Sequence, residues 1–164
     1  MRWPFRLPHP PGDRPSTRVR LAPGSWIGAD AWINLNGVDA RLVVGEGTAV
    51  GHGLVVSAGG TIEVGPGTLL SARVTLLDQQ HDFESWTRPA AAAGTRPRFS
   101  WALTAPRPVV VGAGCWLGIG VVVLPGARIG DGCVVGANSV VSGELPAFSV
   151  AAGAPARVLR SSAP

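Results

Sequence analysis

The chain has 164 residues, which suits a single domain, and a formal net charge of +4 at pH 7. Its 23 glycines and 15 prolines argue against long helices and helical bundles. Because 46% of the residues are hydrophobic, the chain has enough apolar material for a core and is not intrinsically disordered.

The positive charge does not predict a nucleic-acid partner, because all 14 basic residues are arginines that are scattered without a basic run. No apolar run reaches the roughly 18 residues that a membrane span needs. Residues 1–20 form a proline-rich arm that lacks the apolar core of a secretory signal. The sequence therefore favours a cytoplasmic protein.

After the arm, aliphatic residues recur every six positions. They open hexads at Ile27, Ile33, Val44, Val50, Val56, Val64, Leu70 and Leu76, and after a break at Val111, Leu117, Val123, Ile129, Val135 and Val141. Neither the helical period of 3.6 nor the strand period of 2 explains this spacing. A short strand followed by a turn of about 120° does, because three such units close a triangular coil and coils stack about 4.8 Å apart. The aliphatic side chains would point into the prism, and a glycine in second position tolerates the tight corner.

Two cysteines, Cys115 and Cys133, lie 18 residues apart, which is one coil. We expect them to stack on the inner face as small core residues. A catalytic thiol or a redox pair is the alternative, which would need an exposed and electropositive setting. A disulfide is not expected in a cytoplasmic protein.

The hexads stop at His81 and resume near Val109, which leaves a long loop over residues 82–108. Long loops inside compact repeats are usually functional or disordered. Its aromatic and basic residues suit sugar faces and phosphates, or else they fasten the loop to the coils. They are Phe83, Trp86, Phe99 and Trp101, with Arg88, Arg96, Arg98 and Arg107.

His81 ends a hexad and opens the loop, with Asp78 and Asp82 within reach of its ring. An imidazole can accept the proton of a hydroxyl group as the oxygen attacks a thioester. A nearby carboxylate can fix its tautomer. On residue type alone, an ordinary surface histidine is the alternative.

These hexads resemble those of the hexapeptide-repeat acyltransferases, whose fold is a left-handed parallel β-helix. The resemblance predicts an all-β domain over residues 1–164, with five to six coils in residues 21–146 and a protruding loop at 82–108. Residues 147–164 would form a C-terminal segment with a short helix. The string LLDQQHDF resembles the D-x-x-H site of polysaccharide O-acetyltransferases, which implies His81 as general base, Asp78 as its orienting partner and Asp82 as a weaker acceptor-site candidate.

The stretch CWLGIGVVVLPGARIGDGCVVGANSVVSGELPAFSVAAGAPARVLR resembles the closing segment of the same family. By that resemblance Trp116 lines the acyl and acceptor site of a neighbouring subunit in a homotrimer. The residues implied in binding acetyl-CoA are Gly118, Ile119, Ala137, Ser142, Arg157 and Arg160. For the two arginines, a solvated face of the C-terminal helix is the alternative.

Two features depart from the family pattern. Galactoside and maltose acetyltransferases carry an Asn pair where this chain has Gly51 and Gly53, so the acceptor contacts of that branch do not carry over. Gly143 stands where a basic residue is common, which removes one phosphate contact. His52, between the two glycines, is either an acceptor ligand or an exposed turn residue.

The resemblance implies an acetyl-CoA-dependent O-acetyltransferase that acts on a sugar hydroxyl of a polysaccharide or its precursor, without a metal. The alternatives are an N-acetyltransferase for an amino sugar nucleotide, an antibiotic acetyltransferase and a non-catalytic β-helical subunit. A β-helical carbonic anhydrase would bind zinc through three histidines. This chain has three in all, one of them in the arm and no two close together.

Overall fold

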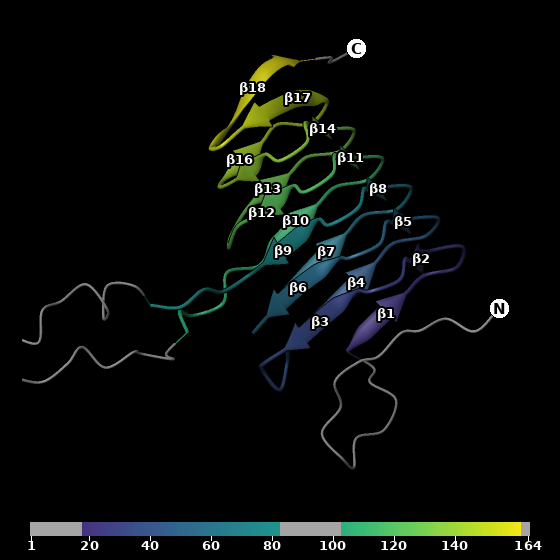
Figure 1. Ribbon diagram of the computed structural model, residues 1–164, viewed down its shortest axis with the longest axis vertical. Coiled ribbons are helices and arrows are strands. Elements are labelled where there is room, and N and C mark those ends of the chain that lie inside the picture. Colours follow the sequence, from purple (N-terminus) through teal and green to yellow (C-terminus); the bar gives the residue numbers. More distant parts are fainter. Residues whose placement is uncertain (1–17, 83–102, 162–164) are drawn as a thin grey trace, which may run out of the picture.

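The computed structural model describes residues 18–82 and 103–161, which form a prism of six stacked coils (Figure 1). Each complete coil contributes one strand to each of three parallel sheets, A, B and C. Within the described residues every element is a strand, a bridge, a turn or a bend, which confirms the predicted all-β solenoid. This part of the chain contains no helix that could cross a membrane.

Apart from β18, which follows β17 directly, the strands of each sheet follow one another at intervals of three in the chain. Sheet A contains β1 (Val19–Leu21), β4 (Arg41–Val44), β7 (Thr61–Val64), β10 (Val109–Val111), β13 (Arg128–Ile129) and β16 (Glu144–Leu145). Sheet B contains β2 (Trp26–Ile27), β5 (Ala49–Val50), β8 (Leu69–Leu70), β11 (Trp116–Leu117), β14 (Val134–Val135), β17 (Ser149–Gly153) and β18 (Ala156–Ser161). Sheet C contains β3 (Trp32–Leu35), β6 (Val55–Ala58), β9 (Thr75–Leu77), β12 (Val122–Val123) and β15 (Val140–Val141).

The three sheets meet at three edges of the prism, which we name after the sheets that the chain connects there: the A/B, B/C and C/A edges. All hexad-opening residues predicted from the sequence are buried in the prism, from Ile27 to Val141. Parallel pairing keeps them in columns, because Leu117 lies opposite Leu70 on one side and Val135 on the other. The prediction that the hexad-opening residues form the core of the prism is thus confirmed.

A ladder of side-chain hydrogen bonds runs up the A/B edge inside the prism. Each donor lies in one coil and its acceptor carbonyl lies in the coil above, at 2.8 to 3.1 Å. The donors are Thr48, Thr68, Cys115 and Cys133. Ser149 occupies the next position of the ladder, and no partner for its buried hydroxyl lies among the described residues. The ladder ends there because no further coil follows.

The predicted C-terminal helix is wrong. Ser149–Gly153 continues sheet B as β17, and Ala156–Ser161 turns back as β18, the one antiparallel strand of the sheet (Figure 1). Gly153 and Pro155 break a helix in this stretch, while the open edge of sheet B offers unpaired backbone groups that β18 satisfies. The first coil also begins earlier than expected, since β1 starts at Val19 and pairs with β4.

The inward direction of the hexad positions can be tested at Ile129, whose side chain is 1% exposed. Ile129→Asp should lower the free energy of unfolding by several kcal/mol, because it buries a carboxylate without a partner. The measurement is thermal or urea unfolding followed by circular dichroism.

Arg128 provides the matched control, because it precedes Ile129 on the same strand and is exposed. Arg128→Asn should change stability by no more than about 0.5 kcal/mol. Equal effects of the two substitutions would contradict the assignment of inner and outer faces.

Candidate active site

The long loop leaves the prism at the C/A edge, directly after β9 (Figure 1). Its two ends run antiparallel: the Thr104 amide donates to Gln80 O at 2.8 Å, and His81 forms a bridge with Leu103. His81 is exposed and lies on this ribbon outside the core. The structure therefore places the predicted base on a hydrogen-bonded support at the foot of the loop. Residues 83–102, with the loop's four aromatic residues and three of its arginines, lie outside the described residues.

Asp78 lies under this ribbon, and its side chain is fully buried. Its two carboxylate oxygens accept hydrogen bonds from the amides of Gly59 and Gly60 in the coil below, each at 2.8 Å. Its backbone carbonyl accepts a bond from the Arg107 amide, where the chain returns from the loop, at 2.7 Å. Asp78 thus joins three segments at the C/A edge. The role of Asp78 in orienting the His81 ring stays a prediction.

Gln79 was not predicted to matter, yet only 5% of it is exposed. The absence of a side chain at Gly59 makes room for it, since a Cβ there would overlap Gln79 Oε1. No hydrogen-bond acceptor for its Nε2 lies among the described residues. The only sequence signal for this packing is the glycine pair Gly59–Gly60 one coil earlier.

The C/A edge carries a second feature near the top of the prism. A cavity of about 180 Å³ is lined by Ser142, Gly143, Glu144 and Arg157, among others. Two predicted cofactor residues, Ser142 and Arg157, are therefore brought together although 15 positions separate them in the chain. They meet because β18 folds back over the last coil. Arg157 offers a guanidinium group at this cavity, which suits an anion such as a phosphate.

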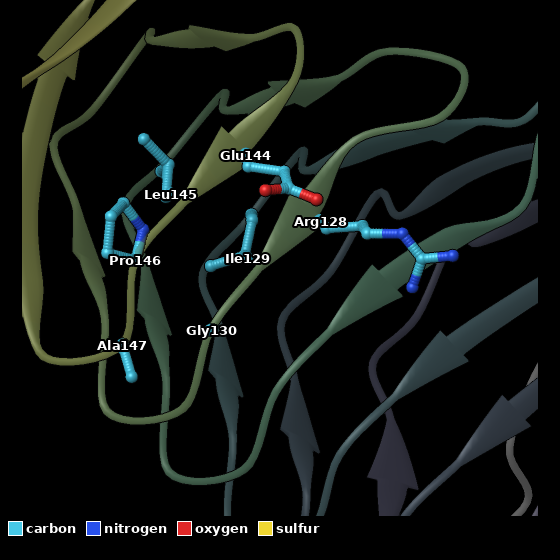
Figure 2. A pocket seen from close by; sticks show the side chains of 7 residues that line it. All are labelled: Arg128, Ile129, Gly130, Glu144, Leu145, Pro146 and Ala147. Carbon is cyan, nitrogen blue, oxygen red and sulfur yellow. The ribbon is translucent and has the colours of Figure 1, made fainter.

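A neighbouring hollow of about 390 Å³ lies at the end of sheet A, around Ile129, Gly130 and Pro146 (Figure 2). Figure 2 shows the side chains of Arg128 and Glu144 next to each other on its rim, on the paired strands β13 and β16. Glu144 and Leu145 also line the smaller cavity. The sequence did not predict this hollow, because its walls come from two coils.

The other predicted groove residues lie at a different edge. Gly118, Ile119 and Ala137 are at the B/C edge, where a Cβ on Gly118 would come within 2.7 Å of the Ala137 amide nitrogen. Small residues therefore allow adjacent coils to approach closely there, and the Ile119 side chain is 40% exposed beside them. A slim, mostly apolar chain could lie along such an edge.

Trp116 projects outward from sheet B and is about half exposed, with its Nε1 donating to Ser71 Oγ at 3.2 Å. Sheet B is the face of the prism opposite the C/A edge (Figure 1). A single chain therefore does not bring Trp116 next to His81. Arg160, opposite Val150 in the β17–β18 hairpin, lies on the sheet B side of the prism as well.

The three outer faces differ in character. The outward row of sheet A carries charges, among them Arg20, Glu63, Arg128 and Glu144. The outward rows of the other two sheets are almost entirely apolar. In sheet B the row is Trp26, Ala49, Leu69, Trp116, Val134 and Val150, and in sheet C it is Trp32, Val55, Thr75, Val122 and Val140.

Cys115 and Cys133 are both buried and carry free thiols, which confirms the core interpretation. Burial raises the pKa of the Cys115 thiol from an ordinary value of 9.0 to about 11. The thiol is therefore protonated at neutral pH and donates a hydrogen bond to Gly130 O. A protonated, buried thiol is a poor nucleophile, so the alternative of a catalytic cysteine loses its support at this position.

The described residues contain no group of three His, Cys, Asp or Glu side chains that could hold a metal ion. His52 and Asp82 lie apart from each other, the first at a B/C turn and the second at the foot of the loop.

Comparison with known proteins yields several matches. Residues 108–143 match the family of bacterial transferase hexapeptide repeats (six repeats). "Probable acetyltransferase Rv3034c" of Mycobacterium tuberculosis is 30% identical over 143 residues, 87% of this chain and 45% of that protein. "Putative lipopolysaccharide biosynthesis O-acetyl transferase WbbJ" of Escherichia coli K12 is 37% identical over 100 residues, 61% of this chain and 50% of that protein. The chain thus spans about half the length of these relatives.

Among solved structures, the hexapeptide-repeat acetyltransferase VCA0836 of Vibrio cholerae O1 biovar eltor, complexed with acetyl coenzyme A, has a similar fold. The TM-score is 0.63 at 26% sequence identity, over 85% of this chain and 71% of that chain. In sequence and in fold, the chain is similar to acetyltransferases.

Proposed function

We propose that this hexapeptide-repeat protein, whose relatives in sequence and in fold are acetyltransferases, transfers an acetyl group from acetyl-CoA to a sugar hydroxyl of a polysaccharide or its precursor. The observation that carries the proposal is the C/A edge, because His81 at the foot of the loop and the Ser142–Arg157 cavity occupy the same edge. The sugar acceptor is supported by the lipopolysaccharide biosynthesis named for one relative.

In the proposed reaction the acceptor hydroxyl gives its proton to the His81 imidazole as its oxygen attacks the thioester carbonyl. The new C–O bond forms, the C–S bond breaks, and CoA leaves as a thiol after taking up the proton. Transfer is direct, so no acyl-enzyme forms, in keeping with a buried and protonated Cys115. Backbone N–H groups stabilise the negative charge on the carbonyl oxygen in the transition state.

Acetyl-CoA would be held along the upper prism. Gly118 and Ala137 are small residues at the B/C edge, where adjacent coils approach closely, so no bulky side chain of theirs would block the pantetheine arm along this edge beside Ile119. Arg157 and Arg160 on β18 supply positive charge for the phosphates. The position of Gly143 in the cavity agrees with the loss of one basic contact there.

The proposed enzyme is a homotrimer with its sites between subunits. The C/A edge of one chain presents His81, and sheet B of another would present Trp116, since the two lie on opposite sides of one prism. The apolar outward rows of sheets B and C supply the surface that such an assembly buries.

His81→Ala should lower acetyl transfer by about 10²–10⁴-fold, the usual cost of removing a general base. Fold, assembly and CoA affinity should stay as in the wild type, because the exposed ring is not part of the core. The assay follows thiol release from acetyl-CoA with sugar and amino-sugar acceptors.

His52→Ala is the matched control, because it removes a second exposed histidine from another edge. It should keep wild-type turnover. If it abolishes turnover while His81→Ala does not, the base is His52 and the assignment of His81 is wrong.

The arginine pair can be tested with dephospho-CoA, which lacks the 3′-phosphate. Wild-type protein should bind CoA more tightly than dephospho-CoA in calorimetry, and changing Arg157 and Arg160 to Gln should remove the difference. Charge-assisted bonds to phosphate contribute about 1.5–3 kcal/mol each, which is readily measured. Arg41→Gln, on a strand of the lower coils, serves as control. A wild type that binds neither ligand would refute the cofactor assignment.

A site shared between subunits predicts complementation. His81→Ala and Trp116→Ala chains should each be nearly inactive as pure proteins, and mixed assemblies should regain activity, because some interfaces then combine an intact His81 with an intact Trp116. The readout is thiol release after co-refolding, with each variant refolded alone as control. Mixtures no more active than the separate variants would place both residues in one chain's site.

A further inference from the structure

We propose that Asp78 is the positioning residue of this site, and that it acts by clamping the foot of the loop to the coil below and not by touching the imidazole. The inference rests on the proposed function, because it takes His81 as the general base. It assigns a role to a buried carboxylate whose two oxygens both receive backbone amides.

The hydrogen bonds that join Asp78 to the coil below are strong for a contact between turns. Two consecutive amides, those of Gly59 and Gly60, donate to the two oxygens of one carboxylate at 2.8 Å each. Hydrogen bonds to a charged acceptor are about twice as strong as neutral ones. Because Asp78 is fully buried, water does not compete for these bonds.

The clamp lies at the start of the ribbon that carries His81. Asp78 is three positions before His81, and its carbonyl accepts the Arg107 amide of the returning chain. The next rung is formed by Thr104 and Gln80, and the His81–Leu103 bridge follows. Described contacts at the foot of the loop therefore connect the coil, through Asp78, with the backbone of His81.

Gly59 and Gly60 are part of the same clamp. A Cβ on Gly60 would lie 3.1 Å from Pro106 Cβ and 3.3 Å from Asp78 Oδ2, so both neighbours would have to shift by a few tenths of an ångström. Neither Gly59 nor Gly60 has a positive φ. Their small size is needed for the close approach of Asp78 and Pro106 and not for an unusual backbone conformation.

The test disrupts the clamp from both sides. Asp78→Asn turns one acceptor oxygen into an N–H donor that faces a backbone amide, and Gly60→Ala displaces the carboxylate from the other side. Asp78→Asn should lower kcat by about 10- to 100-fold, the cost of a base displaced by about 1 Å, and Gly60→Ala should lower it by a smaller factor, because it shifts its neighbours less. KM for acetyl-CoA should be retained, because neither change touches the residues proposed to bind acetyl-CoA.

Asp131→Asn is the matched control. Asp131 Oδ1 accepts the Ala113 amide at 2.8 Å, which is also a carboxylate-to-backbone bond between coils, but it lies at the A/B edge. Its loss should leave kcat unchanged. The double variant Asp78→Asn/Gly60→Ala should be no slower than the slower single variant, because both changes break one clamp.

A second readout does not depend on activity. In protein with isotope-labelled histidine, the ring signals of His81, assigned by their loss in His81→Ala, should be sharp in the wild type and shifted or broadened in Asp78→Asn. Asp131→Asn should leave them in place.

Two results would overturn the inference: unchanged kcat and unchanged His81 signals in Asp78→Asn, or losses that add in the double variant. If the Asp78→Asn variant does not fold, the inference is tested with Gly60→Ala instead, by measuring kcat and the His81 ring signals. Failure of the proposed function looks different, because wild-type protein would then transfer no acetyl group while the His81 signals still respond to Asp78.

Discussion

The structure depends on one constraint, which is that each coil hydrogen-bonds to the next in parallel register. Backbone pairing places Leu117 over Leu70 and under Val135, so any residue type that repeats with the coil becomes a column. A column of aliphatic side chains fills the prism, and the hydrogen-bonded backbone forms its walls. A slip of one residue would turn the column outward, and after the long insertion Val111 returns to the inner column in register with Val64.

The same stacking gives each edge of the prism its own chemistry. At the A/B edge, Thr68 and Cys115 donate to carbonyls of the coil above, so the small polar positions of the hexads stabilise the stack from within. At the B/C edge, Gly118 and Ala137 bring coils close together. At the C/A edge the chain has room to leave and return, because Gly60 lets the ribbon approach the coil.

The proposed division of the site between subunits rests on this geometry. A triangular prism separates an edge from the opposite face, so His81 and Trp116 cannot meet within one chain, although both resemble residues of the same site. The apolar outer rows around Trp26 and Trp32 lead to the same conclusion from packing, since half-exposed tryptophans on two faces favour burial by other copies. Assembly and catalysis would then depend on the same surfaces.

By itself, the sequence determined the all-β solenoid, its core, and the place where the loop leaves, because the six-residue period resumes after each irregularity. It also pointed to His81, through the interruption of that period. The tertiary structure decided two features that the six-residue period does not encode, namely the contacts of Asp78 and the conformation of the C-terminal segment. Asp78 clamps two glycines 18 and 19 residues away because coil stacking, and not sequence distance, brings them together. Residues 156–161 form a strand and not a helix because the last coil leaves an open sheet edge that only a strand can pair with.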